Sequence, residues 1–397
     1  MCSSDLTVPL VKSNYHVFSK SLRVQDFRGI SISSVLSKIF EHCILNRFAD
    51  FLISSDNQFG FKKKMGCTQA IYSMRRVIEQ YTMNGSTVNI CALDLTKAFD
   101  KMNHHGLFIK LMKRNIPVQV LSVIEYWFRS CYTCVKWASS VSCFFKLECR
   151  VRQRGVLSPY FFAIFIDDVI INVVNLKSGC YIKRSCLSII LYADDILLLA
   201  PSIESLQKLV TTCSTELAAL DMSINCNKSV CMRIGPRYSK QCANISIKDS
   251  QDLNWAKSCR YLGITVESAS HFKCNISEAK KSFYRSFNAI FGRVGRIANE
   301  NVIVELLIKK CLPTLLYALE VCSLNKSEIR ALDYVVDSAF KKIFNTTSKD
   351  IVLECRSIFN VISIGDILLR RQRNFLLAYM SLENNFLCQS VISLSTY

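Results

Sequence analysis

The chain has 397 residues, with 50 Lys and Arg against 31 Asp and Glu, which gives a formal net charge of +19. This length allows a sizeable core divided into two or three subdomains. The positive excess suits a polyanionic partner, nucleic acid first and an anionic membrane second, while a basic protein without such a partner has the same composition.

The 20 cysteines are scattered along the chain, and the start, Met1–Asp5, is polar rather than a secretory leader. We therefore expect an intracellular protein whose cysteines are reduced and mostly buried. Cys131 and Cys134 with Cys143 and Cys149 match a zinc site in number. Because no paired second Cys knuckle follows and the intervening residues are typical of strands, we expect no zinc there.

The predicted elements follow the spacing of apolar residues. In chain order they are a helix within residues 30–53 capped by Ser33 or Ser34, a helix over 69–83, a strand over Val88–Leu95 that carries Asp94 at its end, a helix over His104–Arg114, an aromatic helix and a strand pair within 120–150, a helix that Pro159 opens with Ser158 as its cap, a hairpin over 186–200, a helix over Ser202–Leu220, a surface excursion over Gly235–Gln251, a strand over Tyr261–Val266, and a helix over Ser277–Ile297. The alternation of strands and helices up to about residue 270, followed by helices alone, predicts an α+β body with an α-helical appendage.

The hairpin carries the most informative residues of the sequence. Tyr192-Ala-Asp-Asp195 separates two apolar runs, Cys186–Leu191 and Ile196–Ala200, each with the length of a buried strand. Adjacent carboxylates at the tip of an apolar hairpin repel each other and are costly to desolvate, and a divalent cation is the natural compensation. The same apolar run contains two Asp and is too short to span a bilayer as a helix, so we expect no transmembrane segment.

A third carboxylate stands at Asp94, in the segment Cys91–Asp100. Three Asp side chains around Mg²⁺ form the arrangement that two-metal nucleotidyl transfer requires. This constellation predicts a polymerase.

The motifs, taken in order, resemble the reverse transcriptases of LINE-type (non-LTR, Jockey-like) retrotransposons from about Val8 to the C-terminus. The matching segments are Arg28–Glu41 and Gln58–Lys62 of the fingers, Asp94–Asp100 followed by Asn103 and His104, Gln153–Pro159, Tyr192–Asp195, Asn227–Lys228, and Tyr261–Gly263. The resemblance implies a right-hand polymerase, with fingers and palm over residues 1–270, a helical thumb over 271–350 and a C-terminal helical extension over 351–397.

The resemblance also implies a role for each site residue. Asp94, Asp194 and Asp195 would be catalytic and would hold two Mg²⁺ or Mn²⁺ ions. The implied nucleotide-binding residues are Arg28, Lys62, Phe99 and Gln153, and the implied primer or template contacts are Tyr192, Lys228, Tyr261 and Gly263. Phe99 would crowd a ribose 2′-OH and so select deoxynucleotides, although a core Phe at a strand-to-helix turn fits the bare sequence equally well.

For the other Asp and His residues that could bind a metal, we expect a structural role. Asp167 and Asp168 lie within the helix that follows Pro159, where a solvated face or a helix end is the expected role. We expect Asp100 to cap or to form an ion pair rather than to bind metal. His104 and His105 have no Cys or Glu partner at metal-ligand spacing, so we expect a structural role for them.

The chain departs from the family pattern at three motifs. Arg154 replaces a Gly whose backbone can lie close to the nucleotide. The fingers read Gly60-Phe-Lys-Lys-Lys-Met-Gly66 where Gly-Phe-Arg-x-Gly-x-Ser is usual, and Gly29 stands where Pro is common. These changes favour a second interpretation, a catalytically inactive remnant that still binds nucleic acid.

The resemblance therefore implies an RNA-directed DNA polymerase that extends a DNA primer with dNTPs on an RNA template, the element RNA. We expect no association with a membrane. An RNA-dependent RNA polymerase has the same carboxylate arrangement in its palm. Phe99 argues against this alternative, because RNA synthesis needs room for a ribose 2′-OH. We also expect an element fragment without the upstream endonuclease, and a location in cytoplasmic ribonucleoprotein and in the nucleus.

Overall fold

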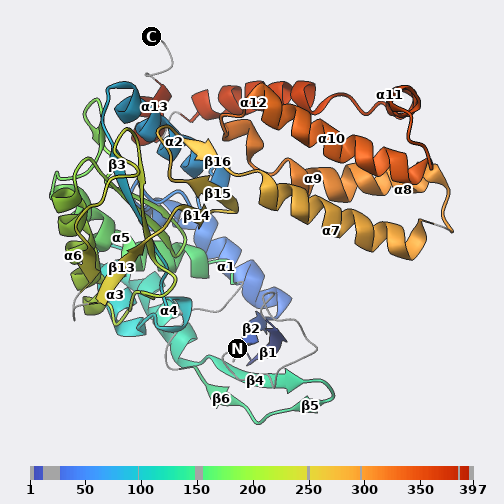
Figure 1. Ribbon diagram of the computed structural model, residues 1–397. Coiled ribbons are helices and arrows are strands. Elements are labelled where there is room, and N and C mark those ends of the chain that lie inside the picture. Colours follow the sequence, from blue (N-terminus) through green and yellow to red (C-terminus); the bar gives the residue numbers. More distant parts are fainter. Residues whose placement is uncertain are drawn as a thin grey trace.

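The computed structural model describes residues 4–11, 27–96, 98–147, 155–247, 251–295, 297–382 and 385–392. Figure 1 shows a central body, a helical arm built from α7 to α12 on one side, and a small strand-rich projection around β1, β2 and β4. Helices and mostly antiparallel strands make up the body, and the arm is helical. The predicted α+β class is confirmed.

A six-stranded sheet forms the centre of the body, in the order β12-β13-β11-β3-β10-β9. Its strands are β3 (Val88–Leu93), β9 (Ile189–Tyr192), β10 (Asp195–Ala200), β11 (Val230–Ile234), β12 (Ile245–Ile247) and β13 (Gln251–Trp255). The predicted hairpin is confirmed, because β9 and β10 pair antiparallel with Tyr192 opposite Asp195. β10 also pairs antiparallel with β3, so the hairpin lies beside the strand that leads to Asp94.

Both faces of this sheet are buried, because successive side chains of a strand point to opposite faces. On one face, Leu93, Ile196 and Leu198 belong to the core formed with α5 (Ser158–Asn175) and α6 (Ile203–Ala219). On the other face, Ile90 and Leu197 belong to the core formed with α2 (Cys67–Met83) and the helical arm. A continuous apolar run such as residues 196–200 therefore has the side chains on both faces of its strand buried.

The remaining elements outside the helical arm belong to the body or to the projection. They are β1 (Ser4–Val11), β2 (Phe27–Ile32), α1 (Val35–Arg47), η2 (Ala49–Leu52), η3 (Ala98–Asp100), α3 (His104–Lys113), α4 (Val118–Arg129), β4 (Tyr132–Trp137), β5 (Ser140–Val141), β6 (Phe145–Lys146), β7 (Tyr181–Ile182), β8 (Ser185–Cys186), β14 (Ser258–Tyr261), β15 (Ile264–Glu267) and β16 (Lys273–Cys274). The strands of the projection form a sheet in the order β2-β1-β4-β5, with β6 also paired to β4.

The helical arm begins at α7. Its elements are α7 (Ser277–Val294), α8 (Glu300–Leu306), the π-helical η4 (Leu307–Cys311), α9 (Leu312–Leu315), η5 (Leu319–Val321), α10 (Lys326–Ile343), α11 (Lys349–Ile358) and α12 (Ile364–Met380), and α13 (Phe386–Ile392) follows. The chain then returns to the body. Tyr379 of α12 hydrogen-bonds Ser73 of α2 at 2.8 Å, and Ser390 of α13 hydrogen-bonds Ser185 of β8 at 2.6 Å.

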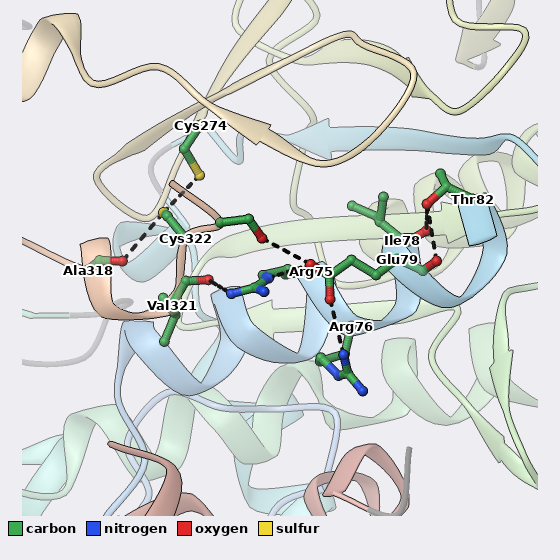
Figure 2. Close-up of polar contacts among 10 residues, drawn as sticks. Arg75, Arg76, Ile78, Glu79, Thr82, Cys274, Ala318, Val321 and Cys322 are labelled. Carbon is green, nitrogen blue, oxygen red and sulfur yellow. Dashed lines mark hydrogen bonds and ion pairs between the residues drawn. The ribbon is translucent and has the colours of Figure 1, made fainter. Parts of the chain in front are cut away.

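Polar contacts join the arm to α2, as Figure 2 shows. Arg75 donates to the Val321 carbonyl at 3.0 Å and pairs with Glu79 at 2.7 Å. The Sγ atoms of Cys274 and Cys322 lie 2.8 Å apart, so the last strand of the body meets the arm at buried thiols. This joint fixes the root of the arm close to the sheet.

The structure also tests the finer local predictions. Ser34 caps α1 by accepting from the Ser37 N–H, as predicted. Ser158 is the first residue of α5 and Leu157 is its N-cap, so the predicted Ser158 cap was wrong by one position. Residues 235–251 are not only a surface excursion, because β12 and the start of β13 lie within them.

Asp167 also differs from expectation. Its side chain is buried, pairs with Arg114 at 2.6 Å and accepts from the Ser55 N–H at 2.8 Å, so the predicted solvated position was wrong for this residue. Within the described residues, α5 is the one helix whose length and composition would allow it to cross a membrane, and most of it is buried in the core.

Candidate active site

The two Asp residues of the hairpin lie in its turn and at the start of β10. Ala193, the first central residue of the turn, has a φ of +58°. A positive φ at this position is typical of the tight turns whose twist matches a two-stranded hairpin. For a residue with a Cβ atom this conformation costs about 1 kcal/mol, so the surrounding structure has to hold it.

Asp94 follows directly after β3, opposite the start of β10. The register pairs Leu93 with Ile196, so the next step along both strands places Asp94 opposite Asp195. The backbone around Asp94 is fixed by two hydrogen bonds, because its N–H donates to Ser229 Oγ at 3.0 Å and its carbonyl accepts from the Asn225 N–H at 2.8 Å. Two carboxylates that are 101 positions apart in the chain therefore become neighbours across one strand pair.

The carboxylates share a negative field. The pKa of Asp195 is raised to about 6, first by desolvation and then by the charges of Asp194 and Asp94. Lys228 Nζ lies 3.6 Å from Asp94 Oδ2 and offsets part of that charge, although the lysine side chain is largely exposed. The net effect is a site where an added positive charge is favourable.

A cleft of about 380 Å³ opens beside these carboxylates. It is lined by Asp94, Asp195, Lys228, Arg260, Tyr261 and Gly263, together with strand residues of β3, β11 and β14. Residues from three other motifs thus meet Asp94 at one cleft, namely Asp195, Lys228, and the pair Tyr261 and Gly263. Tyr261 is almost fully buried, and its hydroxyl has no hydrogen-bond partner among the described residues.

The donor set fits a hard divalent cation, since carboxylate oxygens are the ligands that Mg²⁺ prefers. Among the described residues, no group of three or more His, Cys, Asp or Glu side chains is arranged to hold a metal ion. Held by these residues, an ion would keep other oxygen ligands, as Mg²⁺ bound by one or two carboxylates does in polymerase sites.

Phe99 lies in η3, half-buried between two other aromatic residues. Its ring stacks on Phe162 with centroids 4.2 Å apart and meets Phe61 edge-on at 6.4 Å. Phe61 comes from the fingers motif and Phe162 from α5. The Phe99 side chain is therefore fixed by packing from both sides.

Lys62 occupies a different environment from the carboxylates. Its ammonium donates to the Ser55 carbonyl at 2.7 Å and lies 3.9 Å from Asp56, and burial lowers its pKa. It lines a separate cavity of about 720 Å³ with Lys63 and Lys64. The structure does not bring Lys62 into the carboxylate cleft.

Two predicted nucleotide contacts lie beyond the described part of the chain. Gln153 is outside the described residues, together with the neighbouring Arg154. Arg28 belongs to β2, where its backbone pairs with Leu10, and its side chain is likewise outside the description.

Tyr192 extends the site toward the helical arm. Burial raises the pKa of Tyr192 to about 12, and a hydrogen bond with Cys67 adds to the shift. Burial, and then the neighbouring Cys67 thiol, also raise the pKa of Tyr317. The Tyr317 hydroxyl donates to the Leu262 carbonyl at 3.3 Å. Sequence reasoning missed Tyr317, because nothing in its local sequence indicates that it folds back onto a turn 55 residues earlier.

With this geometry established, comparison with known proteins gives the family. Residues 13–266 match the reverse transcriptase (RNA-dependent DNA polymerase) family, and the chain belongs to it. Members of this family generally use divalent metal ions. The predicted resemblance to non-LTR retrotransposon polymerases is confirmed by the relatives described next.

The chain is 26% identical over 273 residues to a probable RNA-directed DNA polymerase from transposon BS of Drosophila melanogaster, covering 66% of this chain and 29% of that protein. It is 24% identical over 319 residues to the RNA-directed DNA polymerase from mobile element jockey of Drosophila funebris, covering 76% and 33%. The chain thus spans about a third or less of the length of these curated relatives. Among solved structures, telomerase from Candida tropicalis with a telomeric RNA fragment aligns at a TM-score of 0.46 and 11% identity, covering 98% of this chain and 63% of that one.

Proposed function

We propose that this chain is an RNA-directed DNA polymerase that extends a primer 3′ end with dNTPs on an RNA template during retrotransposon replication. The observation that carries this proposal is the convergence of Asp94 and Asp195 across β3 and β10 at a cleft. Desolvation, and then the charges of Asp194 and Asp94, raise the pKa of Asp195 there. Membership of the reverse transcriptase family supports the same conclusion.

In this proposal Asp94, Asp194 and Asp195 hold two Mg²⁺ or Mn²⁺ ions. Bound there, the ions would activate the primer 3′-hydroxyl and stabilise the pyrophosphate leaving group. The carboxylates must be ionised to do so, which favours pH values above the pKa of Asp195, about 6. Lys228, 3.6 Å from Asp94, is placed to attract phosphate oxygens into the cleft.

The remaining roles follow from position. Tyr261 and Gly263 line the cleft and would contact the primer end. The packed ring of Phe99 would exclude a ribose 2′-OH. Lys62 would reach a triphosphate only by leaving the Ser55 carbonyl. The net charge of +19 supports template, primer and element RNA as partners, and we propose cytoplasmic ribonucleoprotein and the nucleus as locations.

A catalytically inactive nucleic-acid-binding remnant is the second candidate. Lys64 stands where the family motif has Gly, and its φ is +62°, so this chain keeps a glycine-type backbone with a lysine in it. Arg154 replaces a second family Gly. Salt-sensitive binding of nucleic acid is expected of both candidates, so binding does not distinguish them.

Primer extension distinguishes them. The assay uses a poly(rA)/oligo(dT) hybrid with Mg²⁺, comparing the wild-type chain with Asp194→Asn at equal amounts of folded protein. Extension by the wild type alone supports a polymerase that works through this hairpin. If the wild type binds the hybrid but does not extend the primer, the proposed polymerase activity is contradicted for this chain. Arg154→Gly then tests whether the arginine at this position abolishes activity.

A further inference from the structure

Gln58, in the loop after η2, is fully buried and lies against the turn of the catalytic hairpin. Its Oε1 accepts from the N–H of Ala193 at 3.2 Å and from the N–H of Gly60 at 2.9 Å. Its Nε2 also approaches the Ala193 carbonyl at 3.5 Å. One side chain therefore contacts both backbone polar groups of the residue that precedes Asp194.

The segment around Gln58 runs along the outer edge of β9. Phe59 N–H donates to the Leu191 carbonyl at 2.8 Å, and Leu191 N–H donates to the Asn57 carbonyl at 2.8 Å. Asn57 Nδ2 donates to the Ile189 carbonyl at 2.7 Å. Because β9 is the last strand of the sheet, this segment covers an edge that no other strand among the described residues pairs.

Gly60 completes the contact from the other side. A Cβ atom on residue 60 would stand 2.6 Å from the backbone nitrogen of Ala193, a distance that real Cβ atoms essentially never show. The loop thus approaches the turn as closely as a backbone can, and the approach requires glycine for steric reasons rather than for a positive φ.

These contacts stabilise the strained backbone of the turn. Ala193 has a φ of +58°, and such a conformation persists in a residue with a side chain only when its surroundings over-determine it. The Gln58 carboxamide fixes the peptide groups on both sides of Ala193. The direction in which Asp194 and Asp195 leave the turn depends on those peptide groups.

We propose that Gln58 is a positioning residue for the proposed polymerase reaction, which clamps the Ala193 backbone so that Asp194 and Asp195 face Asp94. This inference rests on the proposed function. It assigns a role in that reaction to a residue of the fingers motif that does not itself contact substrate or metal. Groups that orient metal-binding carboxylates typically contribute 10- to 100-fold in activity or metal affinity.

The test compares Gln58→Leu with Asn89→Leu. Asn89 is the matched control, because it is a buried amide of β3 that donates to the Ala200 carbonyl at 3.3 Å, at the far end of the same hairpin. Both substitutions replace a buried amide by leucine and remove side-chain hydrogen bonds to the backbone, so both lose stability. The lost bonds go to Ala193 and Gly60 in Gln58→Leu and to the Ala200 carbonyl in Asn89→Leu. Only Gln58→Leu releases the turn.

Two readouts separate positioning from stability. In primer extension, corrected for folded protein, we expect Gln58→Leu to lower kcat about 10- to 100-fold with little change in the KM for dNTP, and Asn89→Leu to stay within about threefold of wild type. In Mn²⁺ binding followed by electron paramagnetic resonance, we expect weaker binding by about tenfold for Gln58→Leu alone. The second readout needs no polymerase activity, so an inactive wild type contradicts the proposed function and still leaves the clamp open to test.

Equal kcat and equal Mn²⁺ affinity in the two variants overturn the inference. Should Gln58→Leu fail to fold, Gly60→Ala tests the same contact without removing the carboxamide, since its Cβ displaces the turn. A folded Gly60→Ala with wild-type Mn²⁺ affinity likewise overturns it, and a loss of affinity supports it.

Discussion

The ring of Tyr317 lies over Gly263 so closely that a Cβ atom on residue 263 would stand 2.7 Å from its Cε1 atom. The tyrosine hydroxyl also donates to the carbonyl of Leu262, the preceding residue. The helical arm thus rests directly on the turn that borders the carboxylate cleft. Leu262 and Gly263 both line this cleft, so Tyr317 packs against part of its wall.

Gly263→Ala is expected to destabilise the protein by about 3 kcal/mol, since it combines a positive φ of +88° with overpacking against Tyr317. Gly85→Ala is the control, because Gly85 also has a positive φ, +71°, but nothing within 4 Å of its Cβ position. For the control we expect a loss of about 1 kcal/mol. Urea unfolding of both variants measures the difference, and equal losses would show that the ring contact is not tight.

Lys64→Gly is expected to stabilise the protein by about 0.5–1 kcal/mol, because Lys64 holds a φ of +62° that glycine adopts without strain. The adjacent Lys63 is not among the residues with positive φ, so Lys63→Gly should be neutral or destabilising through chain entropy. Thermal unfolding of the two variants compares them at the same net charge. A gain in Lys63→Gly equal to that in Lys64→Gly would contradict the backbone explanation.

Asp195→Asn is expected to stabilise the metal-free protein at pH 8 and not at pH 4. The folded-state pKa of Asp195, about 6, is above its ordinary value of 3.8, so the folded protein binds this proton more tightly than the unfolded chain. Its ionised form therefore costs stability at pH values above about 6, and this cost disappears as the pH falls toward 3.8.

Asp195 is desolvated only in part, since the residue as a whole remains exposed to solvent. Solvent screening therefore limits the expected gain at pH 8 to about 1 kcal/mol. Urea unfolding in EDTA at both pH values measures it. Asp168→Asn is the control, since Asp168 pairs with Lys110 at 2.9 Å and its neutralisation should bring no gain at pH 8. A gain of the same size at pH 4 would contradict the assigned cause.

Phe99→Val is expected to relax the choice of sugar. The smaller side chain opens space beside Phe162, and rNTP use relative to dNTP should rise by about 10- to 100-fold in kcat/KM. Single-nucleotide extension with dTTP and UTP measures the ratio. Phe61→Val removes the more distant ring, 6.4 Å away, and should change the ratio much less; equal effects would make the aromatic cluster, rather than Phe99, the determinant.

Arg75→Met is expected to loosen the joint between the arm and the body. Arg75 donates to the Val321 carbonyl and pairs with Glu79 with little exposure. Its loss leaves the Val321 carbonyl without this donor and removes one of the partners of Glu79, and it should cost about 2 kcal/mol. Its neighbour Arg76 contacts Glu79 alone, at 3.2 Å, which makes Arg76→Met the matched control with an expected cost below 1 kcal/mol. Limited proteolysis between the arm and the body would report the same difference, and similar cleavage of the two variants would contradict it.

The sequence by itself determined the secondary structure around the site. Alternating and continuous apolar runs identified the hairpin, the strand before Asp94 and the long helix after Pro159, because local burial patterns follow the period of each element. It also identified the carboxylates as a candidate metal site, since the negative charges of two adjacent Asp residues in an apolar hairpin need a compensating positive charge. Boundaries such as Ser158, and short strands such as β12, have weaker local signals and were missed or misplaced.

Only the tertiary structure decided which residues act together. The strand register places Asp94 beside Asp195, the loop at Gln58 meets the turn at Ala193, and the arm brings Tyr317 onto Gly263. It also buried Asp167 against Arg114 and directed Lys62 to the Ser55 carbonyl. Such contacts join residues far apart in the chain, and their geometry depends on packing of the whole core rather than on any local pattern.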